Sequence, residues 1–467
     1  MARKPRRGTM AHKRRASIPI CVVTGMAIAA VAVVTVDHFN PATGNASTSA
    51  TTDPSPASIK PDPKITPVRS DAPSPSPDVL ATVLGPALAN PGLGNLTGQV
   101  TDTRTGEMLW QQAAHTPQTP ASIVKILTTA AALLTLPTDQ RVTTQVVQGT
   151  APGQLVLIGG GDPTLTAEPA GTSGYYTDAP HLDDLVDQIR RSGVPVSSLV
   201  VDNSLLTGPT MAQGWDPADI AGGSITSIES IMLDGGRLNP FADYSPRTPT
   251  PALDTGRTLA QRLGLDPAAV TEGVAPTTTK PATPVAAVQS APLSTRLRDL
   301  MVQSDDVLAE TVGFEVADAR GFPQTFDGAV AAVVQALQDD GFDTTGTQLS
   351  DTSGLSIDDR LPAHLIDQVL AAAAGTGNPK LRPLLDTLPV AGATGTLANR
   401  FTAPSVGAGW IRAKTGSLSG VSSLAGIVVD QDKRVLTFTL ISNGTRPEQA
   451  RPALDALATA LLGCGCR

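Results

Sequence analysis

The segment from residue 121 to residue 136 is apolar almost throughout, and it restricts what this chain can fold into more than any other feature. A run of this kind predicts a helix that is buried inside the protein. The segment also carries Ser122 and Lys125, which lie three positions apart. Because positions i and i+3 share one face of a helix, the amine of Lys125 can reach the hydroxyl of Ser122.

The neighbours of Lys125 suggest a chemical role for this pair. Ile123-Val124 and Ile126-Leu127 flank the lysine, so we expect its amine to be removed from water. Desolvation favours the neutral amine, which can act as a base, and a serine near a helix start gains from unpaired N–H groups and the helix dipole. The pattern indicates a serine nucleophile activated without histidine. The alternative is a buried helix whose lysine reaches out to solvent.

A second lysine lies in a predicted strand. Residues 410–417 are expected to form a strand that ends in a turn of small residues, and they include Lys414, Thr415 and Gly416. These three residues can bind a carboxylate, because the ammonium supplies charge, the hydroxyl supplies a hydrogen bond and glycine lets the ligand approach the backbone. The alternative is a surface lysine before a turn.

A polar triplet interrupts a third apolar pattern. The helical stripe of residues 293–310 is broken by Ser304-Asp305-Asp306. Such an interruption can line a cleft. It is equally compatible with the start of a second helix, with Ser304 as the N-cap.

Together these three motifs resemble the set found in penicillin-binding proteins and serine β-lactamases, which is Ser-x-x-Lys, Ser-x-Asn and Lys-Thr-Gly in this order. Further stretches resemble one branch, the D-alanyl-D-alanine carboxypeptidase/endopeptidase family of class C low-molecular-mass penicillin-binding proteins. The resemblance covers roughly residues 80 to 460, and the long gap between the first two motifs fits the inserted domains of this branch. The matching stretches are residues 120–133, 159–165, 290–293, 351–356, 388–392 and 395–397.

The resemblance implies an α+β fold of the penicillin-binding/serine β-lactamase-like transpeptidase type. This fold has an antiparallel sheet flanked by helices, here with a large inserted region of one or two smaller domains. We assign residues 80–139 and 290–467 to the catalytic serine peptidase domain and residues 140–289 to the insert. The patterns predict strands at 98–102, 108–112, 143–147, 154–158, 198–201, 421–429 and 435–441, and helices at 182–191, 293–319, 328–338, 362–374, 380–385 and 447–462.

The resemblance also implies the roles of the catalytic residues. Ser122 would attack the carbonyl of the penultimate D-alanine in a peptidoglycan stem peptide, and Lys125 would take its proton. Ser304 would relay a proton to the leaving amine. β-Lactam antibiotics would acylate Ser122, because they mimic the terminal dipeptide.

The remaining motif residues would bind the substrate. Lys414 and Thr415, followed by Gly416, would hold the terminal carboxylate. The backbone N–H groups of Ser122 and Ser417 would form the oxyanion hole.

One motif position departs from the family. The second motif normally ends in Asn, whose carboxamide both accepts and donates, and here it ends in Asp306, whose carboxylate only accepts. Asp306 could pair with Lys125, hold it protonated and weaken it as a base. The sequence therefore leaves a catalytically weak penicillin- or peptidoglycan-binding module as the alternative to an active carboxypeptidase. A DD-endopeptidase, a β-lactamase and a structural protein without a ligand also remain open.

The N-terminal region predicts export. Residues 1–15 carry seven basic residues and no acidic one, and residues 16–36 are uncharged and mostly apolar. This pattern is typical of a basic cytoplasmic segment followed by a transmembrane signal anchor or a signal peptide. Residues 37–79 are rich in Pro, Ser and Thr and are expected to form a flexible linker. We therefore expect a protein on the cell-wall side of the cytoplasmic membrane, either anchored to that membrane or secreted.

The charge of the chain and its histidine and cysteine patterns argue against a nucleic-acid-binding protein and against a metalloprotein. The net charge is −8, with the basic residues concentrated at the N-terminus, which argues against nucleic-acid binding. The five histidines are scattered, and the sequence contains no His-Glu-x-x-His motif and no cysteine pair at zinc spacing. We expect no metal and no cofactor. With three cysteines in the chain, the core does not depend on disulfides.

Overall fold

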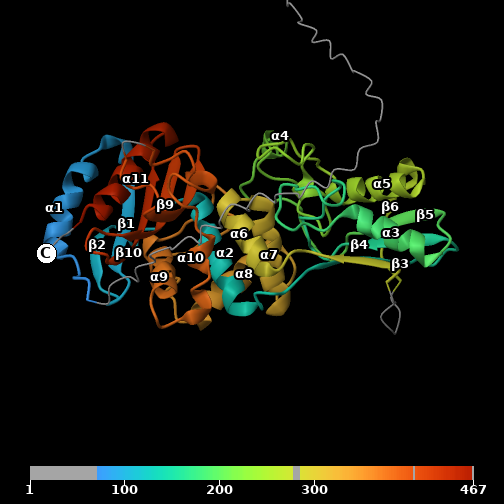
Figure 1. Cartoon of the computed structure of the whole chain (residues 1–467), viewed down its shortest axis with the longest axis horizontal. Helices are drawn as coiled ribbons and strands as arrows, with labels where there is room; N and C mark the ends of the chain where they lie inside the picture. Colours follow the sequence, from blue (N-terminus) through green and yellow to red (C-terminus); the bar gives the residue numbers. More distant parts are fainter. Residues whose placement is uncertain (1–70, 277–283, 403–404, 465–467) are drawn as a thin grey trace, which may run out of the picture. The chain divides into compact units, whose positions relative to one another are not determined.

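The computed structural model describes residues 71–276, 284–402 and 405–464 (Figure 1). The expected basic segment, signal anchor and most of the linker lie outside these ranges. Within them, no helix combines the length and the apolar character needed to cross a membrane.

A five-stranded antiparallel sheet forms the first layer. Its strand order is β2-β1-β10-β9-β8, so the two N-terminal strands continue a sheet made by the three C-terminal ones. The central contact is the register of β1 with β10, in which Asn95 pairs with Asn443 and Asp102 with Leu436. The bounds are β1 Asn95–Asp102, β2 Met108–Gln112, β8 Ile411–Leu418, β9 Val421–Val429 and β10 Val435–Asn443.

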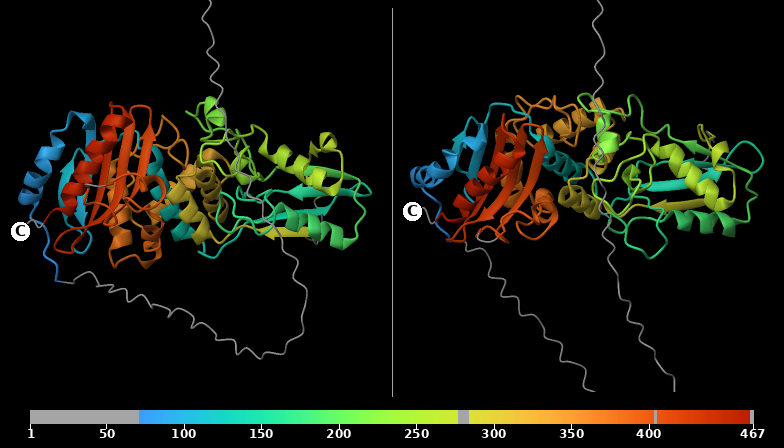
Figure 2. Two further views of the ribbon diagram at one scale, coloured as in Figure 1. Left: turned by 45° about the horizontal axis from the view of Figure 1, so that its top comes forward. Right: turned by 90° about the horizontal axis from the view of Figure 1, so that it is seen from above.

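Helices cover both faces of this sheet (Figure 2). α1 (Pro77–Leu88) and α11 (Pro447–Leu462) pack on one apolar face, and α9 (Ala363–Ala374) packs on the other. Pro447 suits the first position of α11, because the N–H that it lacks would have no partner there. The predicted antiparallel sheet flanked by helices is confirmed.

A helical layer built around α2 carries most of the buried apolar residues. α2 (Val124–Thr135) is buried from Val124 to Leu133, which explains why its sequence is apolar on every face. In the views of Figures 1 and 2, α6, α7 and α8 lie between the two sheets of the molecule. The surrounding helices are α6 Leu293–Gln303, α7 Asp306–Ala319, α8 Phe326–Asp339 and α10 Leu384–Thr387.

A second sheet, of mixed direction, is formed by strands between residues 143 and 289. Its order is β6-β5-β4-β3-β7, with β4, β5 and β6 parallel and β3 antiparallel to both neighbours. α3 and α5 bury their apolar faces against it. The bounds are β3 Thr143–Gln148, β4 Gln154–Ile158, β5 Ser198–Asp202, β6 Thr271–Glu272, β7 Ala286–Gln289, α3 Leu182–Ser192, α4 Ala218–Gly222 and α5 Pro251–Leu263.

The structure differs from the sequence-based expectations at several elements. α1 begins at Pro77, inside the range assigned to the linker, and neither α1 nor α5 was expected. The helix expected at 380–385 is split into a 3-10 turn, Pro379–Leu381, and α10, because Pro383 has no N–H to donate and crowds the preceding turn. The helix expected at 293–319 is split into α6 and α7.

Candidate active site

Ser122 lies in a 3-10 turn, Ala121–Ile123, that leads directly into α2. Ala121 has a φ of 54° in the left-handed region, which costs a non-glycine residue roughly 1–2 kcal/mol. Neighbouring glycines surround this turn. A Cβ at Gly354 would lie 2.2 Å from the carbonyl oxygen of Ala121, and one at Gly416 would lie 3.0 Å from the Ala121 Cβ. The turn that presents Ser122 is therefore held in place by close backbone packing.

The amine of Lys125 is fully buried at the centre of three oxygen atoms. It donates to Ser122 Oγ at 3.1 Å, to Asp306 Oδ1 at 2.5 Å and to the carbonyl oxygen of Ser353 at 2.7 Å. The structure thus brings Ser122, Lys125 and Asp306 together. Lys125 does not reach out to solvent, which removes the alternative of a buried helix with an exposed lysine.

The second motif occupies the break between α6 and α7. Ser304 ends α6 with a φ of 60°, and Asp306 is the first residue of α7. The N-cap is Asp305, whose carboxylate accepts a hydrogen bond from the N–H of Leu308. The suggestion that Ser304 caps the second helix is therefore wrong. With its backbone in the left-handed conformation, Ser304 instead places its hydroxyl beside Lys414.

Asp305 ties the second motif to the 140–289 region. Its buried carboxylate accepts from Arg237 at 2.7 Å and from the Tyr176 hydroxyl at 3.2 Å, and Arg247 lies 3.8 Å away. Burial alone would raise the pKa of Asp305, but the two arginines outweigh it and lower that pKa to about 2. This anchor could not be predicted from the sequence, because the partners of Asp305 lie far away along the chain.

Lys414 lies in β8 with its side chain fully buried. Its amine donates to Ser304 Oγ and to the carbonyl oxygen of Thr415, both at 2.7 Å. Among the described residues, no carboxylate forms a salt bridge with it. Burial, reinforced by the charge of Lys125, lowers the pKa of Lys414 well below its ordinary value, and Asp306 opposes that shift.

The pKa of the Asp306 carboxyl shifts in the direction opposite to that of Lys414. Burial raises the pKa of its carboxyl, and Lys125 offsets only part of the effect. A raised carboxyl pKa makes the transfer of a proton from Lys125 to Asp306 easier than it would be at the protein surface.

Two further residues belong to the site and were not singled out from the sequence. Ser353 offers its carbonyl oxygen to Lys125, and Thr396 Oγ1 accepts a hydrogen bond from Thr415 Oγ1 at 2.8 Å. Both lie in stretches that carried the family resemblance. At the end of β8, the Ser417 hydroxyl donates to the carbonyl oxygen of Gly416 and accepts from Arg451 at 3.2 Å.

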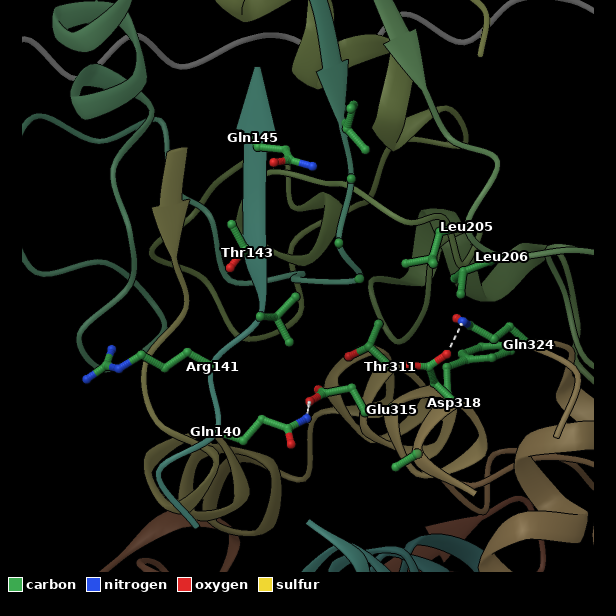
Figure 3. A pocket seen from close by; sticks show the side chains of 17 residues that line it. Gln140, Arg141, Thr143, Gln145, Leu205, Leu206, Thr311, Glu315, Asp318 and Gln324 are labelled. Carbon is green, nitrogen blue, oxygen red and sulfur yellow. Dashed lines mark hydrogen bonds between the residues drawn. The ribbon is translucent and has the colours of Figure 1, made fainter. Parts of the chain in front are cut away.

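A cavity of about 400 Å³ lies outside this site, between the second sheet and α7 (Figure 3). Its walls combine apolar side chains, such as Leu205 and Phe314, with polar ones. Gln140 donates to Glu315 at 3.3 Å and Gln324 donates to Asp318 at 2.9 Å. None of the residues assigned to catalysis or substrate binding lines this cavity.

Comparison with known proteins identifies relatives of the whole chain. The family model described as "D-Ala-D-Ala carboxypeptidase 3 (S13) family" matches residues 80–246 and 243–461. Carboxypeptidase DacB of Mycolicibacterium smegmatis is 51% identical over 450 residues, which cover 95% of this chain and 97% of that protein.

Solved structures show the same fold. The crystal structure of penicillin binding protein 4 (dacB) from Haemophilus influenzae gives a TM-score of 0.67 at 20% identity, covering 82% of this chain and 98% of that one. The same protein complexed with a novel β-lactam gives a TM-score of 0.59 at 20% identity, covering 81% of this chain and 97% of that one.

Proposed function

This chain belongs to the D-Ala-D-Ala carboxypeptidase 3 (S13) family of serine peptidases, and we propose that Ser122 is the nucleophile with which it removes the terminal D-alanine of peptidoglycan stem peptides. The observation that carries this proposal is the position of the Lys125 amine, fully buried and 3.1 Å from Ser122 Oγ. This is the geometry that a serine needs in order to lose its proton without histidine.

The first half of the reaction forms an acyl-enzyme. Ser122 Oγ attacks the carbonyl carbon of the penultimate D-alanine while its proton passes to Lys125. The backbone N–H groups of Ser122 and Ser417 stabilise the negative oxygen that develops. The C–N bond then breaks, and Ser304 relays the proton: it gives its own proton to the amine of the leaving D-alanine and receives in exchange the proton that Lys125 took from Ser122. Water hydrolyses the ester that remains on Ser122.

Lys125 must be neutral to accept that proton. The nearest partner of Lys125 is Asp306 at 2.5 Å, which favours the ammonium form. The proton of Lys125 must leave this ion pair before the attack, so the cost of moving it opposes acylation. The active form of Lys125 is then the neutral amine.

The other end of the substrate binds at β8. Lys414 and Thr415, followed by Gly416, would receive the terminal carboxylate of the peptide. The carboxylate would favour the protonated form of Lys414, which burial disfavours. Substrate binding and the charging of Lys414 would then be coupled.

One observation favours a second candidate function. Because Asp306 holds the Lys125 amine in an ion pair, a module that binds stem peptides or penicillin with little turnover is the alternative. The two are separated by measuring D-alanine release from a peptide that ends in D-alanyl-D-alanine, with a cross-linked peptide as a second substrate for endopeptidase activity. The carboxypeptidase proposal requires release by the wild-type chain and none by Ser122→Ala. Labelling of wild-type Ser122 by penicillin without release would instead support the binding module.

We further propose that the chain acts on the cell-wall side of the cytoplasmic membrane and is inhibited by β-lactams. The support for export is the pattern of residues 1–15 and 16–36, and the support for inhibition is the β-lactam complex of the Haemophilus influenzae protein. Cell fractionation of the full chain and of a variant without residues 1–36 tests the location. A fluorescent penicillin that labels wild type but not Ser122→Ala tests the inhibition.

A further inference from the structure

Two histidines and an aspartate from three separate segments meet outside the active site. They are His115 after β2, Asp343 after α8 and His364 in the first turn of α9. One nitrogen from each histidine and one oxygen from Asp343 all lie within 4.8 Å of one another. The two imidazole rings have their centroids 4.2 Å apart.

The orientation of His364 is fixed by a buried hydrogen-bond network. Its Nδ1 lies 2.9 Å from Gln99 Oε1. The amide of Gln99 cannot be reversed, because its Nε2 donates to the carboxylate of Asp367 at 3.0 Å. Gln99 Oε1 is therefore an acceptor, His364 Nδ1 carries the hydrogen, and His364 Nε2 has a free lone pair. A histidine held in this way, with one nitrogen donating to an oxygen, is the usual arrangement at metal sites.

The other two ligand candidates can adjust. His115 and Asp343 are exposed, and Asp343 uses Oδ1 to accept from the N–H of Thr345 at 3.0 Å, so Oδ2 can serve as a ligand. A tetrahedral zinc ion has ligands at about 2.0–2.2 Å, so its donor atoms lie closer together than 4.8 Å. Because His115 and Asp343 are exposed, their side chains can rotate towards a shared ion.

We propose that His115, Asp343 and His364 bind a zinc ion, with water as the fourth ligand. Two imidazoles and one carboxylate suit Zn²⁺, whereas Mg²⁺ and Ca²⁺ prefer oxygen ligands alone. This site could not be predicted from the sequence, because its three ligands are scattered along the chain and only the fold brings them together.

The ion would fasten the segment that leads to Ser122. That segment is already bonded to the start of α9: the N–H of His364 donates to Ala114 O at 3.0 Å, and the backbones of Gln118 and Leu361 exchange hydrogen bonds at 2.8 and 3.2 Å. Zinc would add a link from this segment to the connection between α8 and α9. Since it binds only the folded chain, it would raise the unfolding temperature.

The test uses the full chain after removal of metals with a chelator, titrated with ZnCl₂ in a calorimeter. We expect one site that includes these ligands, a higher unfolding temperature with Zn²⁺, and no comparable effect of MgCl₂. His115→Gln and Asp343→Asn should each weaken zinc binding at least about tenfold, because even loss of an outer-shell partner costs 10–100-fold in affinity.

His181→Gln is the matched control, since His181 lies in the 140–289 region and contacts the carbonyl oxygen of Glu168. It should bind zinc like the wild type. The proposal is overturned if the wild type binds no zinc, or if His115→Gln and Asp343→Asn both bind it as tightly as the wild type. Unfolding of each variant in chelator checks that it is folded. The readouts are independent of D-alanine release, so this test and that of the proposed function can fail separately.

Discussion

Asp306 Oδ1 lies closer to the Lys125 amine, at 2.5 Å, than Ser122 Oγ does, at 3.1 Å. The residue that departs from the family motif is thus the nearest neighbour of the base. A carboxylate at this distance stabilises the ammonium form of the lysine, so part of the free energy barrier to acylation is the cost of moving its proton.

Replacing Asp306 with Asn should speed acylation. The variant Asp306→Asn removes the negative charge that favours the ammonium form of Lys125 and restores a group that can donate to the substrate. We expect the rate of acylation by a fluorescent penicillin to rise about tenfold or more at neutral pH, which is a part of the roughly 10²–10⁴-fold that a general base contributes. Asp187→Asn removes an equal charge from an exposed position of α3 and should bring no such gain. A slower Asp306→Asn variant would show that the carboxyl group helps the base.

Substrate affinity should depend on pH through Lys414. Because burial lowers the pKa of this amine well below the ordinary value, it loses its proton at a lower pH than an exposed lysine would. Only the protonated form attracts a carboxylate, so KM for a D-alanyl-D-alanine peptide should rise as pH increases through the alkaline range. The same peptide with an amidated C-terminus should bind weakly and lack this rise. An identical pH dependence for both peptides would contradict the assignment.

The sequence predicts those parts of the site that lie within one element. Ser122 lies in the turn that leads into α2, Lys125 lies in the first turn of α2, and Lys414 to Ser417 share β8. Their short spacing marks these residues as candidates, and the combination of motifs implies their roles by resemblance. The hydrogen bond from Lys125 to the carbonyl oxygen of Ser353 depends on how distant loops pack.

The role of the second motif could be predicted only in part. The break at residues 304–306 is visible in the apolar pattern, but either Ser304 or Asp305 can cap a helix. Arg237 and Arg247 decide which residue caps α7, because they hold Asp305 in the buried capping position and leave Ser304 for the site.

The helix α5 was not predicted, because only one side of it is apolar. That side packs on the second sheet.

The buried pair of Asp305 and Arg237 should stabilise the folded protein. Asp305→Asn leaves two buried arginines without their carboxylate, and we expect it to lower the free energy of unfolding at pH 7 by ~3–5 kcal/mol. Urea unfolding measures this loss. Arg257→Gln is a suitable control, since its ion pair with Asp254 is exposed and should contribute less than about 1 kcal/mol.

The same carboxylate should make stability depend on acid pH. The folded-state pKa of Asp305 is lowered to about 2, below the value of an unfolded aspartate, so its contribution is complete above about pH 4 and is lost as pH falls towards 2. The wild type should lose more stability than Asp305→Asn between pH 4 and pH 2, by roughly 2 kcal/mol. Parallel losses in the two proteins would show that Asp305 is not the group responsible.

Gly354 should be required for the position of Ser122. A Cβ at this residue would lie 2.2 Å from the carbonyl oxygen of Ala121, and the φ of Gly354 is 82°, so Gly354→Ala adds both a clash and backbone strain. We expect it to lower the free energy of unfolding by ~1–3 kcal/mol and to displace the turn that carries Ser122. A displacement of about 1 Å can cost 10²-fold in rate, so labelling by penicillin should slow far more than the loss of stability explains. Gly377→Ala is the matched control, because a Cβ there would meet nothing within 4 Å and it should label like the wild type. Normal labelling by folded Gly354→Ala would mean that the turn accommodates the methyl group without moving the nucleophile.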